Sequence, residues 1–277
     1  IQQKNKELLE SIEIWNATKS FIPVAFFKKE KIITGNPIQD NQIIRTLYGI
    51  LNLDNLAVLS AQSTFARFKK STQLKSDVVN IIGWVKLVQY KAKETIVPPF
   101  NQENQEQLIN ELKLILSKNK NVLDKVKSKL HEFGIKLIYQ AKGEKTPVDG
   151  ISFWSEGNPA IGMTIRHNRL DNFAFTLFHE LGHIYEHLIN NDTAEFIDLE
   201  TKSEIEEYKN SIEEKQANEF AENKLIPKED WAIFSASLSA KNNDRDIIAF
   251  AKKINVHPAI VKGRICHSLK SYRSITS

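Results

Sequence analysis

Residues 171–187 read DNFAFTLFHELGHIYEH, and this stretch decides how the rest of the chain must fold around it. In an α-helix, residues four apart lie on one face, so His179 and His183 can direct their imidazoles at one cation. Glu180 follows about 100° further round the helix, close enough to act on a metal-bound water without ligating the metal. The stretch therefore predicts a long helix that carries a metal site and runs to about Ile189.

A helical wheel divides this helix into two faces. One face is a broad apolar stripe, and the other carries the three histidines together with Glu180 and Thr176. Phe175 also lies on the histidine side, which favours a lined cleft over a solvated polar face. Gly182 lies in the helix interior, where glycine costs roughly 1 kcal/mol relative to alanine, so we expect close packing there. The apolar stripe consists of Ala174, Leu177, Leu181, Ile184, Tyr185 and Leu188.

Two histidines do not complete a zinc site, because catalytic zinc takes three protein ligands and a water. His187 lies one turn beyond His183, but three ligands along one straight helix would span about 12 Å, which is too far for a single ion. The third ligand is therefore expected from another element. The acidic helix predicted from Ser203 to Lys224 offers several candidates.

Two glutamates of this acidic helix are the stronger candidates. Glu214 shares a stripe with Ala217 and Ala221, and two alanines there would let the acidic helix approach the histidine helix closely. Glu213 lies nearer Ala217 and Phe220, so periodicity alone does not exclude it. Most of the other acids on the helix are interpreted as solvated surface.

The whole chain predicts an α+β fold, in which a helical N-terminal region is followed by a small domain with a short sheet and further helices. A break at 96–101 is the best linker candidate, and it divides the chain into domains at 1–100 and 101–277. Three short segments rich in β-branched and aromatic residues predict an antiparallel meander. Helices are predicted at 1–20, 38–51, 56–70, 76–94, 102–117, 120–133, 244–254 and 258–269, and strands at 134–140, 150–154 and 159–165.

Composition limits the classes of function. The net charge is +4, and the basic residues of the first half lack the compact or aromatic-interleaved pattern of a nucleic-acid interface, which favours solvated helix faces. Cys266 is the single cysteine, which excludes an internal disulfide and a thiolate metal cluster and fits a reducing cytosol. No apolar stretch approaches the length of a membrane span. The start lacks an initiator Met and a secretory pattern, which suggests a fragment.

Two separated motifs together resemble the ImmA/IrrE family of metallopeptidases. The first is Thr176-Leu-Phe-His-Glu-Leu-Gly-His183, and the second is Glu214-Lys-Gln-Ala-Asn-Glu-Phe-Ala221, which is followed by Leu225-Ile226-Pro227. By this resemblance Glu214 is the third ligand of a gluzincin-type zinc site, with manganese as the alternative ion. Asn218, four residues further on, would be the outer acceptor that orients a ligand imidazole.

The resemblance also implies an activity and partners. It implies a zinc-dependent regulatory endopeptidase of the cytoplasm, linked to transcription regulation and stress response, that cuts a repressor-like protein or a toxin or antitoxin partner. Residues 1–130 resemble the helical region that follows an XRE-type helix-turn-helix, which would precede residue 1, and DNA is a partner only if that unit exists. The rival hypothesis is a transcription regulator or antitoxin whose zincin-like domain is a sensor or partner-binding module. No membrane partner is expected.

The expected chemistry assigns a role to several further residues. Glu180 takes the proton from the attacking water and passes it to the leaving amine. The oxyanion also needs a donor, for which Arg166, His167 and His267 are the candidates. An edge strand of the meander at 161–165 is expected to bind the substrate as an added strand.

Overall fold

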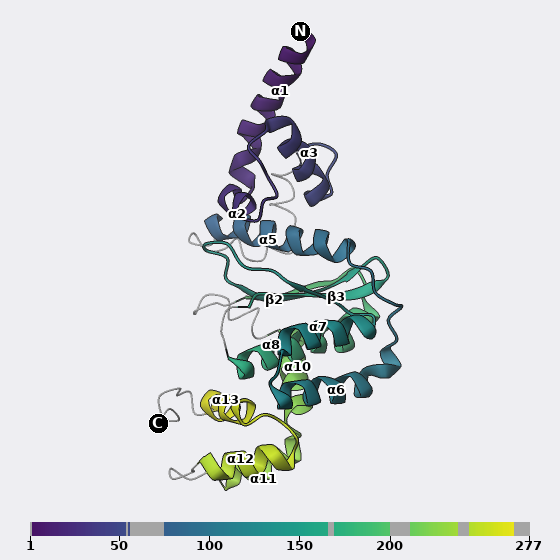
Figure 1. Cartoon of the computed structure of the whole chain (residues 1–277), viewed down its shortest axis with the longest axis vertical. Coiled ribbons are helices and arrows are strands. Elements are labelled where there is room, and N and C mark those ends of the chain that lie inside the picture. Colours follow the sequence, from purple (N-terminus) through teal and green to yellow (C-terminus); the bar gives the residue numbers. More distant parts are fainter. Residues whose placement is uncertain are drawn as a thin grey trace. The chain divides into compact units, whose positions relative to one another are not determined.

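The computed structural model describes residues 2–53, 55, 75–165, 169–199, 211–237 and 244–268. The chain divides into two compact units, each made from several stretches. The first unit comprises Ile1–Glu94, Gln140–Val148 and Leu199–Ile205, and the second comprises Thr95–Tyr139, Asp149–Asp198 and Glu206–Ser277. The architecture is α+β, as predicted, with a helical N-terminal region followed by a small sheet and its helices (Figure 1). The division at residue 100 stays a prediction.

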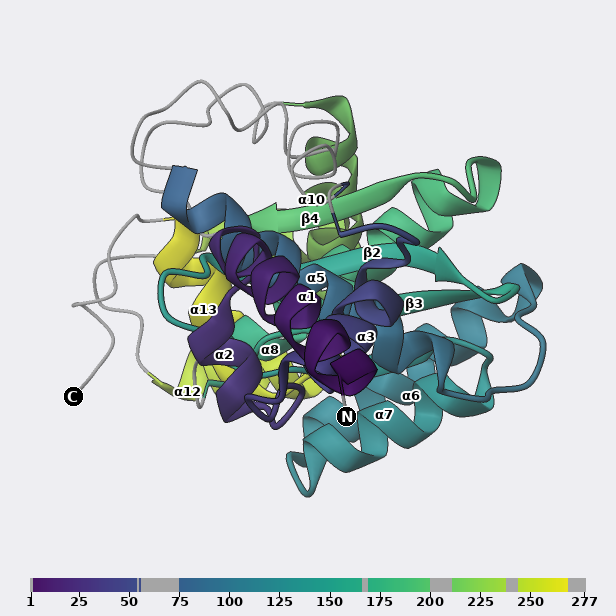
Figure 2. The ribbon, with the colours of Figure 1, turned by 90° about the horizontal axis from the view of Figure 1, so that it is seen from above.

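Helices build most of the described part of the first unit. They are α1 (Gln2–Thr18), the short turn η1 (Lys19–Phe21), α2 (Val24–Lys29), α3 (Pro37–Tyr48) and α5 (Lys75–Lys93). α1 and α3 pack side by side (Figure 2). The indole Nε1 of the fully buried Trp84 donates a hydrogen bond to the carbonyl oxygen of Gln140 at 3.1 Å. This bond attaches the Gln140–Val148 segment to α5.

The ends of α3 follow from the local sequence. The Asn36 side chain accepts hydrogen bonds from two backbone N–H groups of the first turn, and Pro37 occupies the first helical position, where no N–H partner is needed. Gly49 ends the helix in the left-handed conformation, with a φ of 65°. The helix predicted at 38–51 therefore ends earlier than expected. The helix predicted at 56–70 lies outside the described residues.

The sheet of the second unit has four strands in the order β1-β3-β2-β4. They are β1 (Lys136–Tyr139), β2 (Val148–Ser155), β3 (Asn158–Met163) and β4 (Glu195–Leu199), and Figure 2 shows the last three next to one another. β2 and β3 form an antiparallel hairpin. Glu156 and Gly157 close it with φ values of 48° and 79°, the positive pair that a type I′ turn requires.

The predicted antiparallel meander is wrong in its pairing. β1 pairs in parallel with β3, with Leu137 opposite Ile161, and β4 is a strand that the sequence pattern did not indicate. A direct hairpin from β1 to β2 does not form because the chain between them, Gln140–Val148, belongs to the first unit. β3 consequently lies inside the sheet, so the predicted edge-strand role of 161–165 is also wrong.

The helices of the second unit share one apolar core with the sheet, and α7, α8 and α10 lie on one side of it (Figure 1). Leu130, Leu177 and Phe178 are fully buried in this core. Within the described ranges, no helix has the length and apolar content to cross a membrane. The bounds are η3 (Gln102–Asn104), α6 (Gln105–Lys118), α7 (Val122–Glu132), α8 (Leu170–Gly182), α10 (Ile212–Leu225), α11 (Lys228–Ala236), α12 (Asp244–Lys253) and α13 (Pro258–Ser268).

Gly182 is the point of close approach between α8 and α10. A methyl group added there would lie 2.9 Å from the Cα of Ala217 and 3.1 Å from the Cβ of Phe220. Ala217 and Ala221 are both fully buried. The close packing expected at Gly182 and at the two alanines is therefore confirmed, and it brings the two helices near enough to share a site.

The histidine helix is a regular α-helix only as far as Gly182. A π-helical turn, η4 (His183–His187), and a 3-10 turn, η5 (Leu188–Asn190), continue it to the predicted end. The acidic helix begins at Ile212, after Ser211 caps it by accepting a hydrogen bond from the backbone N–H of Glu214 at 3.2 Å. Its predicted start at 203 lies outside the described residues.

Candidate metal centre

The end of α8, the π-helical turn and the first turn of α10 meet at one buried point. His179 is 3% exposed, His183 0% and Glu214 5%. Each offers one ligand atom, and these atoms all lie within 4.8 Å of one another. Glu213, the alternative that periodicity left open, is exposed. The structure thus brings together the two histidines and the glutamate that the sequence singled out.

The spacing of these donor atoms fits a metal ion. The Nε2 atoms of His179 and His183 are 3.1 Å apart, and Glu214 places its Oε2 3.4 Å from the first and its Oε1 3.5 Å from the second. Zinc bonds of 2.0–2.1 Å in a tetrahedron would set neighbouring donors about 3.3 Å apart. Two imidazoles and a carboxylate are also a donor set that zinc accepts. The residues present therefore fit a divalent cation.

The electrostatics of the three groups point the same way. Burial favours the neutral form of His179, but the carboxylate of Glu214 beside it and the other nearby carboxylates outweigh burial and raise its pKa to about 9. Burial lowers the pKa of His183 to about 4. Burial would raise the pKa of Glu214, but the nearby imidazoles of His179 and His183 lower it to about 2. Glu214 is thus a buried negative charge that lies next to both imidazoles.

Each histidine has an outer partner at its second ring nitrogen. The Oδ1 of Asn218 lies 3.0 Å from Nδ1 of His179, where the amide oxygen accepts the ring N–H. The Nδ1 of His183 faces the Nδ1 of His187 at 3.1 Å, and the Nε2 of His187 faces the Oε1 of Gln216 at 3.0 Å. These bonds leave Nε2 of both His179 and His183 directed at the common point.

His187 therefore stands behind His183 and is not a third donor. It belongs to the π-helical turn, whose wider geometry departs from the straight helix assumed from the sequence. Phe196 of β4 stacks on the His183 ring, with centroids 4.5 Å apart and an interplanar angle of 10°. The periodic pattern of the sequence signalled neither the π turn nor the packing of β4 against it.

Glu180 lies beside the three ligands and points toward the sheet. It is fully buried, and its Oε2 accepts a hydrogen bond from the Oγ of Ser152 at 2.5 Å. Its Oε1 is buried without a hydrogen-bond partner among the described residues. Burial raises the pKa of Glu180 well above its ordinary value, and the charge of Asp198 on β4 adds to this. Nothing in the sequence around Ser152 or Asp198 indicated that either would be near the site.

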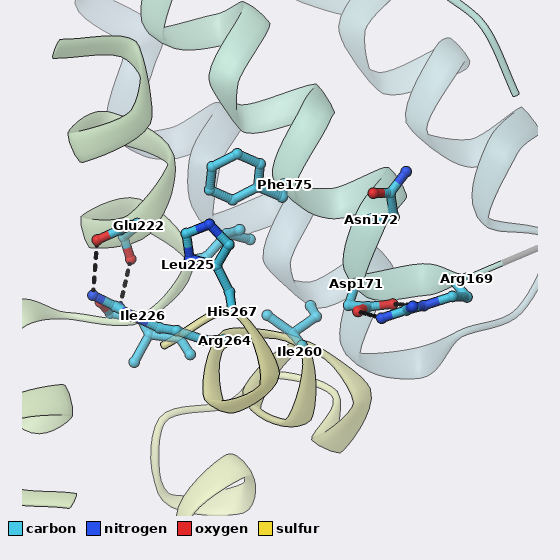
Figure 3. A pocket seen from close by; sticks show the side chains of 11 residues that line it. Arg169, Asp171, Asn172, Phe175, Glu222, Leu225, Ile226, Ile260, Arg264 and His267 are labelled. Carbon is cyan, nitrogen blue, oxygen red and sulfur yellow. Dashed lines mark hydrogen bonds and ion pairs between the residues drawn. The ribbon is translucent and has the colours of Figure 1, made fainter. Parts of the chain in front are cut away.

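The structure describes one of the three candidate oxyanion donors, His267. Arg166 and His167 lie outside the described residues. His267 is an exposed residue of α13 and lines a pocket with Phe175 of α8, which Figure 3 shows facing it. Phe175 connects this pocket to the metal centre, because its ring centroid lies 6.3 Å from that of His179. The pocket also contains the ion pairs of Arg169 with Asp171 and of Arg264 with Glu222 (Figure 3).

Comparison with known proteins agrees with the geometry of the site. No curated protein matches the chain. Residues 130–265 match a peptidase family model, Peptidase_M78, described as the IrrE N-terminal-like domain. This range runs from the end of α7 to α13 and includes every residue of the candidate metal centre. The chain therefore carries a metallopeptidase-type domain of the ImmA/IrrE family.

Proposed function

We propose that this protein is a zinc-dependent endopeptidase of the gluzincin type that hydrolyses a peptide bond in a specific protein partner. The observation that carries the proposal is Glu180, a buried carboxylate beside His179, His183 and Glu214. A site that only stabilises the fold needs ligands and no additional acid. A carboxylate with one free oxygen in this place supports hydrolysis, because it can move a proton.

His179, His183 and Glu214 would hold the ion, and manganese is the alternative to zinc. The bound zinc would polarise the scissile carbonyl and lower the pKa of a water molecule toward neutrality. Asn218 and His187 keep the two imidazoles in the tautomer and orientation that ligation requires.

Glu180 acts as the proton carrier in this proposal. Its Oε1 accepts a proton from the attacking water and returns the proton to the leaving amine. Burial raises the pKa of this carboxylate above its ordinary value, which makes Glu180 a stronger base toward the attacking water than an exposed carboxylate would be. The oxyanion donor stays among Arg166, His167 and His267.

The substrate is proposed to bind as an extended segment. β4 lies at one edge of the described sheet, and its Phe196 stacks on His183. A peptide that adds to β4 would therefore pass close to the ligands, in place of the strand at 161–165. By family likeness the partner is a cytoplasmic repressor-like regulator, or an antitoxin or toxin, and DNA is a partner only if a helix-turn-helix precedes Ile1.

Two variants test the proposal. We expect Glu180→Gln to keep one metal ion per chain and to lose at least about 100-fold in cleavage rate, whereas Glu214→Ala should lose metal. The measurements are metal content by mass spectrometry and product formation from a defined peptide library with zinc added. Wild-type cleavage by Glu180→Gln would remove the hydrolytic assignment.

A second function is favoured by one observation, the burial of the site. The four site residues are at most 5% exposed, which suits a domain that senses metal or binds a partner without cutting it. In that case the wild-type protein and Glu180→Gln would bind metal equally, and neither would cleave any peptide of the library.

A further inference from the structure

Two residues of β2, Gly150 and Ser152, contact Glu180 from the sheet and fix its position. Residues two apart on a strand face the same side, so both of these positions are directed at α8. Ser152 is fully buried, and its Oγ lies 2.5 Å from Glu180 Oε2 and 3.0 Å from the Glu180 main-chain carbonyl oxygen. The hydroxyl therefore reaches both ends of one residue on the neighbouring helix.

Gly150 supplies the space that this carboxylate fills. A Cβ atom at this position would lie 1.9 Å from Glu180 Oε1 and 2.7 Å from its Cδ, far inside the contact distance. The φ of Gly150 is not positive, so glycine is required here for room and not for backbone freedom. Any side chain at 150 would force Glu180 to move.

The hydrogen-bond count at Ser152 defines which oxygen of Glu180 stays free. A serine hydroxyl has one hydrogen to donate. When that hydrogen is given to Oε2, the partner that remains without a hydrogen bond among the described groups is Oε1, which is also buried. The contact with β2 thus fixes one oxygen and leaves the other available for a proton from another molecule.

We propose that Ser152 and Gly150 are positioning residues for the peptidase reaction and form a socket on β2 that aims Oε1 of Glu180. The proposal rests on the proposed function of Glu180. The socket is separate from the bonds that orient the metal ligands, because those come from Asn218 on α10 and His187 on the π-helical turn. Substitutions in the socket should therefore change the orientation of the Glu180 carboxylate without changing metal affinity.

The first test separates a positioning role from a purely structural one. We expect Ser152→Ala to keep one zinc ion per chain and to lower kcat about 10- to 100-fold with little change in KM, because Ser152 is fully buried behind Glu180. Ser152→Thr, which keeps the hydroxyl, should recover most of kcat. Ser155→Ala is the matched control, since Ser155 lies on the same strand and on its opposite face, and it should retain wild-type kcat.

Gly150→Ala tests the other half of the socket. The added methyl group should lower kcat to the level of Glu180→Gln. Combining it with Glu180→Gln should then give no further loss, because both changes remove the same group. A further loss in the double variant would contradict the socket. The Ser152 series stands independently if Gly150→Ala does not fold.

A measurement without substrate distinguishes this proposal from the peptidase assignment. In urea unfolding of zinc-loaded protein, Ser152→Ala combined with Glu180→Gln should shift the midpoint by less than the sum of the single shifts. Additive shifts, or wild-type kcat for Ser152→Ala, would overturn the socket while the peptidase stands. Non-additive shifts in a protein that cleaves no peptide would overturn the peptidase assignment and leave the contact intact.

Discussion

The two histidine ligands are oriented by chemically different partners. His179 faces the amide oxygen of Asn218, which can only accept, so the proton on His179 Nδ1 is defined. His183 faces another imidazole, His187, whose own tautomer depends on Gln216. His179 is therefore oriented by one hydrogen bond, whereas His183 is oriented by two hydrogen bonds in series.

Removing the amide should weaken metal binding without removing a ligand. We expect Asn218→Ala to lower zinc affinity about 10-fold or more, because the His179 ring loses the acceptor that fixes its orientation. Competition with a chromophoric chelator measures the change. Asn223→Ala, five residues further along α10, is the control and should bind zinc as the wild type does. Equal affinities of the two variants would contradict a role for Asn218.

The His187 contact predicts a graded series. His187→Phe keeps a ring next to Phe196 but removes Nδ1, so zinc affinity should fall about 10-fold. Gln216→Ala removes only the second hydrogen bond, the one to His187, and the loss of zinc affinity should be smaller. The same titration measures both. A larger loss of zinc affinity in Gln216→Ala than in His187→Phe would contradict this order of the two hydrogen bonds.

At the scale of elements, the site depends on how closely α8 and α10 approach. Gly182→Ala adds a methyl group against Ala217 and Phe220, and we expect it to lower the free energy of unfolding by about 1–3 kcal/mol despite alanine's better helix propensity. Zinc affinity should fall as well, because Glu214 lies on the helix that is pushed away. Urea unfolding and zinc titration measure the two effects.

Gly263→Ala is a matched control for that prediction. Its added Cβ would lie 2.4 Å from the Asp171 carboxylate, at the contact of α13 with α8, away from the ligands. It should destabilise the fold and leave zinc affinity unchanged. If it weakened zinc binding as much as Gly182→Ala does, the loss would reflect general unfolding and not helix separation.

The sequence predicted the elements whose signal is local. Periodicity found α8 and α10, and the stripe of Glu214 with two alanines and the position of Gly182 predicted their close contact. It did not find β4, a five-residue strand whose EFIDL lies in an acidic segment. The parallel pairing of β1 and the contact of Ser152 with Glu180 both join residues more than twenty positions apart, and no local pattern encodes them.

At the scale of the whole molecule, the cation would link α8 and α10, two helices that are separated in the sequence by β4 and the residues that follow it. Zinc should therefore stabilise the second unit, by about 2.7 kcal/mol when the free ion is at 100 times its Kd. Thermal unfolding with zinc and with a chelator measures the difference. Glu214→Ala should show the same Tm in both conditions, and a zinc-dependent Tm in this variant would place the ion elsewhere.

The first unit consists of three separate segments of the sequence, and two of these segments lie between segments of the second unit. The Gln140–Val148 segment shows what this means, since Gln140 bonds to Trp84 and Gly143 lies against the ring of Phe26. A fusion or deletion with its junction near residue 95 would separate these partners. Neither unit is one continuous stretch of sequence, so recombination at a single junction cannot move either unit alone. We therefore expect the two units to be inherited together and to vary in sequence together.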